Sequence, residues 1–136
     1  LPNDPDAGDI ARLTTLCMAV MEPIRLALGC PIRSTSGYRS QAVNAKIGGA
    51  KLSQHVIAEA ADFTPVGYPG GVEAAMARLA GATRVEGLVV DQLIVYPGGH
   101  FLHVSFTTRR TNRGELLRSA APSGSGGPYS RWRNVA

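Results

Sequence analysis

Two histidines and one aspartate form the feature that most constrains the fold, because together they offer three ligands for one metal ion. His55 and Asp62 lie in the segment Ser53–Asp62, and His103 lies much later, in the run His100–Ser105. Imidazole and carboxylate groups are common ligands of Zn²⁺, and three protein ligands leave a fourth tetrahedral position open. A structural zinc site is normally closed by four protein ligands. The set therefore indicates hydrolytic chemistry and requires a fold that brings distant segments together.

The hydrophobic pattern around these residues predicts two strands. Polar and apolar side chains alternate along Phe101–Thr107, which places His103 on the polar face of the first strand. The segment Glu59–Thr64 reads as a second strand, with Asp62 beside small alanines. If the two strands are neighbours, Asp62 and His103 converge, and the loop before Glu59 can add His55. Taken singly, a residue of this kind is more often an ordinary surface or strand-end group, because a lone histidine is rarely a metal ligand.

The remaining pattern contains helices and strands in mixed order. Apolar residues at helical spacing predict a helix that Asp9 caps and that runs to Leu28, with a kink or break at Pro23 and Gly29 as its C-cap. The other expected elements are a strand at Pro31–Thr35, a helix from Ser40 to Ile47, a helix at Val72–Ala80 and a strand at Leu88–Tyr96.

This order predicts an α+β fold with a small antiparallel sheet packed against helices. A length of 136 residues is that of one domain, which we place at residues 1–118. Residues 119–136 read as a Ser/Gly/Pro- and Arg-rich C-terminal tail, with a linker at Ala120–Gly127 and with Tyr129 and Trp132 able to pack back on the body. No apolar run reaches the length of about 18 residues that spans a membrane, so no membrane span is expected.

The charge pattern is basic, with a formal net charge of +4, and beyond Thr108 six arginines face a single acid, Glu115. Such an end can pair locally with carboxylates, or it can contact an anionic polymer such as nucleic acid, teichoic acid or a membrane surface. Nucleic acid is the weaker alternative because no aromatic residues are interleaved with the arginines. The six are Arg109, Arg110, Arg113, Arg118, Arg131 and Arg133.

Several motifs resemble, in the same order, those of a known family of zinc peptidases. The string Ser53-x-His55-x-x-Ala58-x-Ala60-x-Asp62 looks like its SxHxxGxAxD motif. The family comprises D-alanyl-D-alanine carboxypeptidases and L-alanyl-D-glutamate endopeptidases, and the chain is most similar to its small single-domain branch, carried by phages and bacteria. The resemblance runs from about Ala11 to Arg118. Its further motifs are Ser36–Ser40, Val43-Asn44 with Gly48-Gly49, Asp91–Ile94, and His103–Phe106 with Asn112-Arg113.

The resemblance implies a fold shared with the signalling domain of Hedgehog proteins and one zinc ion held by the three ligands named above. It also implies that Arg39 stabilises a developing oxyanion and that Ser53 and Tyr38 belong to the substrate site. A fixed guanidinium that faces the tetrahedral oxygen acts only as charge develops, which suits this role. The alternative for Arg39 is a salt bridge that staples its turn.

Two positions depart from the family pattern. Ala58 stands where the family usually has Gly, which is mild unless the residue needs a positive φ. Family members commonly place an acidic general base three residues before the last ligand, where this chain has His100, and the related branch often has Glu where this chain has Tyr96. A histidine can accept a proton near neutral pH, so we expect His100 to be the base. Tyr96, Glu59, and weak or absent catalysis remain the alternatives.

The sequence therefore predicts a zinc metallopeptidase that hydrolyses peptide bonds of bacterial peptidoglycan stem peptides, either as a carboxypeptidase or as an endopeptidase. Such an enzyme would act at the cell wall, in the periplasm or outside the cell, or be delivered by a phage as an endolysin. The alternative is a non-catalytic or weakly catalytic zinc-containing protein that binds the cell wall or assembles with phage virion proteins.

Overall fold

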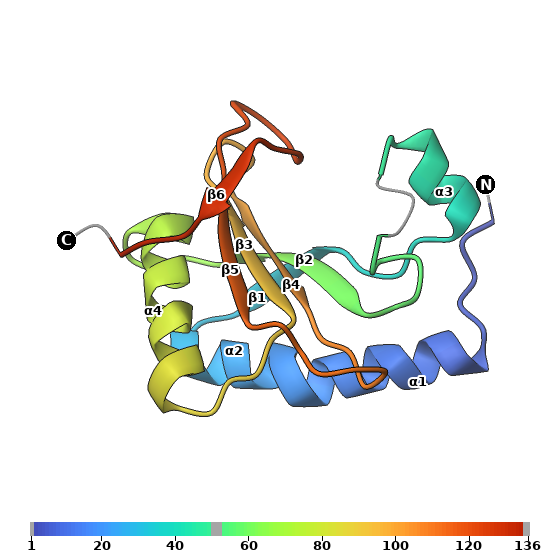
Figure 1. Ribbon diagram of the computed structural model, residues 1–136, viewed down its shortest axis with the longest axis horizontal. Coiled ribbons are helices and arrows are strands. Elements are labelled where there is room, and N and C mark those ends of the chain that lie inside the picture. Colours follow the sequence, from blue (N-terminus) through green and yellow to red (C-terminus); the bar gives the residue numbers. More distant parts are fainter. Residues whose placement is uncertain (1, 50–52, 135–136) are drawn as a thin grey trace.

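The computed structural model describes residues 2–49 and 53–134 and has an α+β fold (Figure 1). Within these residues, no helix has both the length and the apolar character needed to cross a membrane. The helices are α1 (Ala7–Leu16), the π-helical turn η1 (Cys17–Met21), α2 (Glu22–Leu28), α3 (Gln41–Lys46) and α4 (Gly71–Val85). The strands are β1 (Ile32–Ser36), β2 (Ala60–Pro65), β3 (Gln92–Tyr96), β4 (Phe101–Ser105), β5 (Glu115–Ser119) and β6 (Tyr129–Arg131).

The six strands form one sheet in the order β1-β2-β4-β3-β5-β6. The α+β class with a sheet packed against helices is confirmed, and the sheet is mixed, because β3 and β5 pair in parallel whereas the other pairs are antiparallel. The connection from β4 to β5 explains this pairing. Its Arg110 and Arg113 bind the carboxylate of Asp91, directly before β3, with nitrogen–oxygen distances of 2.7 and 2.8 Å. β4 already ends beside the start of β3, and these ion pairs hold the connection at that end of the sheet, so that β5 starts there and runs in the same direction as β3.

The long N-terminal helix begins three residues earlier than its sequence suggests. Asp6, not Asp9, is the N-cap, and the two residues form a capping box in which each carboxylate accepts the other's backbone N–H. Pro23 does not interrupt the helical segment, which runs without a gap from α1 through η1 into α2. It follows η1, where the N–H of Glu22 bonds the carbonyl five residues earlier, and this wider turn accommodates the proline ring. Gly29 is the left-handed C-cap, as expected.

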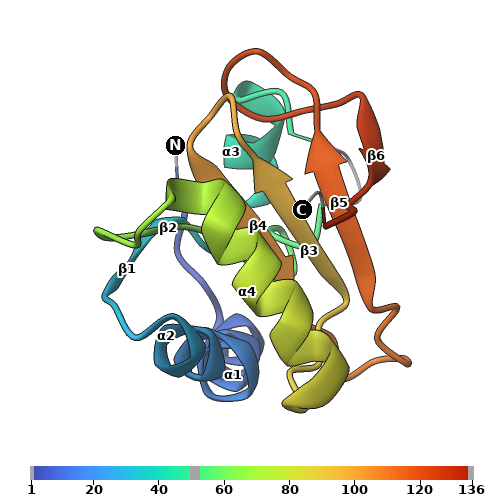
Figure 2. The same ribbon diagram turned by 90° about the vertical axis from the view of Figure 1, so that its left-hand side faces the viewer.

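The hydrophobic core lies between the sheet and the helices α2 and α4 on one of its faces (Figure 2). Alternate side chains of the central strands point into this layer, among them Phe63 of β2, Leu93 of β3 and Leu102 of β4, which are fully buried. Because strand side chains alternate between faces, Asp62 and His103 lie on the opposite face. The candidate ligands are thus on the side of the sheet that these helices leave uncovered.

Part of the expected tail belongs to the folded body. Ser119 is the last residue of β5, and β6 pairs antiparallel with β5. Trp132 follows β6, donates its backbone N–H to the carbonyl of Leu116 at 2.9 Å, and is 7% exposed in the core. The stretch Ala120–Gly127 contains no helix or strand. Residues 135 and 136 lie outside the described part of the chain.

Candidate metal centre and its pocket

The three predicted ligands meet on the open face of the sheet. Asp62 and His103 lie directly opposite each other in the antiparallel pair of β2 and β4. Asp62 Oδ1 is 2.9 Å from His103 Nδ1 and 3.2 Å from His55 Nε2. The three ligand atoms all lie within 4.8 Å of one another. The structure therefore brings together residues from three separate segments at one point.

His55 is oriented by the turn before β2, where its side chain is 2% exposed. Its Nδ1 lies 2.7 Å from the carbonyl oxygen of Gly37, which can only accept a hydrogen bond. The proton of a neutral ring is therefore on Nδ1, and the lone pair of Nε2 points at Asp62. Two acceptors at this distance repel each other unless a proton or a metal ion lies between them. A carbonyl that orients a histidine in this way is a usual outer partner of a metal ligand.

The donor set fits a zinc ion. Bonds of about 2.0–2.2 Å in a tetrahedral arrangement place neighbouring ligand atoms about 3.3 Å apart, close to both distances to Asp62. Among the described residues, no further His, Cys, Asp or Glu joins the group. Three ligands of this kind can hold one ion and leave a position for a reactant.

The electrostatics of the site favour the metal-binding protonation state. Burial opposes ionisation of Asp62, but the adjacent imidazoles of His103 and His55 outweigh it and hold the pKa of this carboxyl well below its usual range. Burial lowers the pKa of His103, although Asp62 opposes the shift. At neutral pH the carboxylate is therefore charged and the imidazole of His103 neutral, which is the state in which both groups bind a metal.

Arg39 and Ser53 flank the ligands. The backbone N–H of Arg39 bonds the carbonyl of His55 at 3.0 Å, and its Nη2 donates to Ser53 Oγ at 3.2 Å. Ser53 Oγ in turn accepts the N–H of His55. Burial lowers the pKa of Arg39. Arg39 forms no ion pair among the described residues. The alternative role considered for it, a salt bridge that stabilises this turn, is therefore not observed.

A pocket of about 370 Å³ opens above the ligands. It contains Arg39 and Ser53 together with His55, Asp62 and His103, as the predicted site requires. The remaining lining residues are Gly48, Gly49, Tyr96, Phe101, Ser125, Gly126, Gly127 and Tyr129.

A family model described as Peptidase M15 matches residues 5–105, well over half of the chain. The chain belongs to the peptidase M15 family. No curated protein matches the chain. Membership confirms the resemblance drawn from the motifs and supports a peptidase. The match ends at Ser105, the last residue of β4, so it includes all three candidate ligands.

One wall of the pocket in this M15 protein comes from beyond the matched region. Tyr129 of β6 hydrogen-bonds Tyr96 through their hydroxyl groups at 2.8 Å, and Tyr96 stacks on Phe101 with ring centroids 4.5 Å apart. The turn at Gly98 lies against the tail, because a Cβ there would stand 2.3 Å from the carbonyl oxygen of Ala121. We did not expect the tail at this site, and its Gly/Ser-rich composition gave no signal of such a role.

Three of the predicted residues do not line the pocket. Tyr38 is half-buried, and burial raises the pKa of its hydroxyl, helped by nearby aspartates. His100 is exposed in the turn before β4, and its carbonyl accepts a hydrogen bond from Thr64 Oγ1 at 3.1 Å. Glu59 is buried elsewhere and bonded to Arg109, as its place on the opposite strand face predicts.

Ala58 has a φ of +58° and is fully buried. This is the left-handed region that favours glycine, so the family's usual Gly at this position has a conformational reason. The chain tolerates alanine in a turn that several hydrogen bonds hold, including Ala58 N–H to the carbonyl of His55 at 3.2 Å.

Proposed function

We propose that this M15 protein is a zinc metallopeptidase that cleaves peptide bonds in peptidoglycan stem peptides. The observation that carries the proposal is the convergence of His55, Asp62 and His103 beneath an open pocket that also holds Arg39. A Zn²⁺ ion bound there would act as a Lewis acid toward a peptide carbonyl and allow water to attack at neutral pH. The pocket volume of about 370 Å³ suits a short peptide segment.

Arg39 is placed to stabilise negative charge on the substrate's carbonyl oxygen. Its backbone is tied to His55, and one of its guanidinium nitrogens is tied to Ser53, so the group is held beside the ligands before substrate binds. A preorganised cation costs little reorganisation as charge develops. Ser53 is held two residues from His55, where its hydroxyl can also contact the substrate.

His100 is the proton acceptor that we propose. Its carbonyl accepts a hydrogen bond from Thr64, two residues along β2 from Asp62, so its backbone lies near this ligand, and its exposed ring, outside the pocket lining, has no hydrogen bond in the described part of the chain. The two other candidates suit the role less well. Glu59 is engaged by Arg109. Burial and the hydrogen bond to Tyr129 raise the pKa of Tyr96, so this hydroxyl stays protonated and serves as a donor.

The proposed substrate places the protein at the bacterial cell wall, in the periplasm, outside the cell or on a phage particle. Its support is the motif resemblance to the small branch of the family that phages and bacteria carry. Whether the protein acts as a carboxypeptidase or an endopeptidase is read from the product: release of D-alanine identifies the first, and a new internal amine the second.

The experiment is digestion of purified peptidoglycan by zinc-loaded protein, with product masses followed over time. Three samples are compared: the wild type, the wild type with a chelator, and Asp62→Asn. The proposal predicts stem-peptide cleavage in the first sample alone. If the zinc-loaded wild type releases neither D-alanine nor a new amine, the enzyme proposal fails for this substrate.

The second candidate is a zinc-containing protein that binds the wall or a phage particle without cutting. It is favoured by one observation: Asp62 is the one carboxylate among the described residues that line the pocket, so no acidic base stands beside the ligands. Sedimentation with peptidoglycan and no released product would support this candidate against the first.

A further inference from the structure

The arginines of the C-terminal part divide into two groups. Four of the six beyond Thr108 are neutralised by carboxylates: Arg109 by Glu59, Arg110 and Arg113 by Asp91, and Arg118 by Glu73. Local pairing therefore accounts for most of the basic end. Arg131 and Arg133 form no ion pair within the described part of the chain, and neither does Arg84 on α4.

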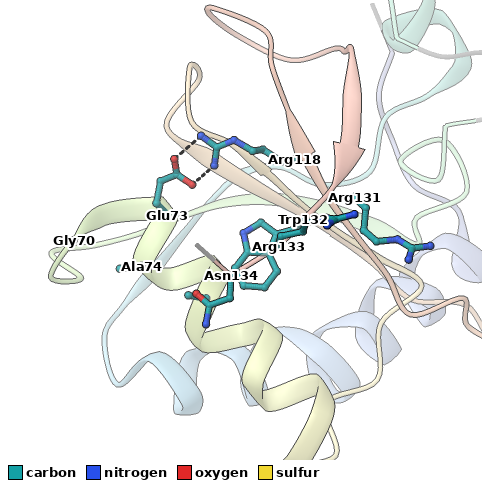
Figure 3. Close-up of a pocket in the computed structure, with 9 residues that line it drawn as sticks. Gly70, Glu73, Ala74, Arg118, Arg131, Trp132, Arg133 and Asn134 are labelled. Carbon is teal, nitrogen blue, oxygen red and sulfur yellow. Dashed lines mark hydrogen bonds and ion pairs between the residues drawn. The ribbon is translucent and has the colours of Figure 1, made fainter. Parts of the chain in front are cut away.

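These unpaired arginines gather on one surface. A hollow of about 720 Å³ between α4 and the strands β5 and β6 is lined by Arg118, Arg131 and Arg133. Figure 3 shows Arg118 beside Glu73 of α4, and Arg131 pointing away from this pair. A second hollow of about 520 Å³ shares Arg131 and adds Arg84 and Arg113. We call the joined surface the arginine trough. Its other lining residues include Trp132 and Asn134.

The trough has the chemistry of an anion site. Two acids line the trough. Glu73 is already bonded to Arg118, as the dashed lines in Figure 3 show, and Glu115 accepts a hydrogen bond from the side-chain amide of Gln92. Arg84, Arg131 and Arg133 have no ion pair among the described residues, so positive charge remains in excess over Glu115. The first turn of α4 lines the same hollow, and its N-cap Gly70 has no side chain to cap the free N–H groups. A helix N-terminus and arginine side chains both favour phosphate groups.

The buried indole of Trp132 lies beneath both hollows and anchors this part of the chain to the core. It is 7% exposed, and the neighbouring residues Arg131 and Arg133 stand on either side of it in the chain. The same burial removes the ring as a stacking platform, and the trough-lining residues include no other aromatic side chain among those described. Binding of single-stranded nucleic acid usually depends on such platforms.

We propose that the arginine trough binds a linear polymer of phosphodiesters without bases, of the polyol-phosphate class. Several phosphates along one chain would engage Arg131, Arg133 and Arg84 in turn. Tyr129, two residues before Arg131 on β6, lines the metal pocket, so the trough and that pocket are lined by residues about 7 Å apart along one strand. The proposal stands without the peptidase activity, because none of the trough arginines belongs to the metal centre.

The test measures binding of synthetic poly(glycerol phosphate) over a series of salt concentrations. The double variant Arg131→Ala/Arg133→Ala is compared with Arg33→Ala/Lys46→Ala, which removes the same charge from exposed positions elsewhere. The trough variant should bind roughly tenfold more weakly, with a salt dependence flatter by about 1.4 logarithmic units per decade, as expected for two lost phosphate contacts. Equal losses in both variants would mean that net charge, not the trough, binds the polymer, and would overturn the proposal.

A variant that should bind more tightly is included, because a loss of binding alone could also arise from misfolding. Glu73→Gln removes the rim carboxylate and releases Arg118, so the polymer should bind roughly threefold more tightly. No gain, or a loss, counts against the trough. Single-stranded DNA of equal charge and vesicles of anionic lipid form two further arms, and tighter binding to either than to poly(glycerol phosphate) would also overturn the proposal.

Discussion

Zinc should raise the thermal stability of this protein, because the ion binds the folded state alone. Its ligands, His55, Asp62 and His103, come from distant positions and lie within 4.8 Å of one another once the sheet has formed. Free zinc at one hundred times its dissociation constant should add about 2.7 kcal/mol to the free energy of unfolding. For a domain of this length, that corresponds to a rise of about 9 °C in Tm.

Asp62→Asn should remove most of this gain. Asp62 Oδ1 contacts both histidines, and the amide keeps its shape but loses the charge that neutralises the metal. Loss of an outer partner alone costs about 10–100-fold in metal affinity, so we expect at least about 100-fold here. The shift at the same zinc concentration should then fall to about 1 °C.

Differential scanning calorimetry with and without zinc, after treatment with a chelator, measures both effects. Glu86→Gln is the matched control, because it neutralises an exposed carboxylate that pairs with Arg78 far from the ligands. The control should keep the full zinc shift. A full shift in Asp62→Asn, or a lost shift in Glu86→Gln, would refute the assignment of this carboxylate as a ligand.

Trp132→Ala should lower the free energy of unfolding by about 3–5 kcal/mol in urea titrations. Tyr129→Ala, at a half-exposed position, should cost about 1–2 kcal/mol through the lost hydrogen bond to Tyr96, and equal effects of the two variants would contradict an anchoring role for the indole. His100→Ala should keep the zinc shift and slow peptide cleavage by about 10²–10⁴-fold, and unaltered turnover would exclude it as the base. Arg110 and Arg113 outweigh the burial of Asp91 and hold its pKa below the ordinary 3.8, so its contribution to stability is present above that pH and lost as pH falls below it. Asp91→Asn should therefore destabilise by about 2 kcal/mol at pH 7 and flatten acid unfolding below pH 4, and an unchanged acid limb would count against this pairing.

The convergence of the three candidate ligands was the most predictable part of the molecule. Alternation along Phe101–Thr107 put His103 on the polar face, and the same reasoning put Asp62 beside alanines, so the meeting of the two required only that β2 and β4 be neighbours. His55 was expected to join them from the loop before Glu59. Strand alternation has a strict period of two, which is why a sequence carries it reliably.

The two strands that the sequence did not predict, β5 and β6, show no such alternation. β6 has three exposed residues, Tyr129–Arg131, and β5 has one fully buried residue, Ser119, so neither shows an apolar face. Tertiary contacts position both strands. Asp91 binds Arg110 and Arg113 in the connection before β5, and Trp132, directly after β6, packs in the core. The pocket wall formed by Ser125–Gly127 depends on the same contacts.

The predicted starts of α1 and β3 were wrong for local reasons. Asp6 and Asp9 are both suitable N-caps, and the capping box uses both, so composition could not decide which came first. Leu88 and Val90 are buried without belonging to β3, which begins at Gln92. An apolar run indicates burial but does not show whether the backbone is paired.

Anomalous diffraction at the zinc absorption edge, from crystals of the zinc-loaded protein, tests the central claim most directly. The account predicts a single peak within about 2.0–2.2 Å of His55 Nε2, Asp62 Oδ1 and His103 Nδ1, with the fourth position facing the pocket and free of protein atoms. A peak that lacks any of these three ligands, or one closed by a fourth protein ligand, would contradict it.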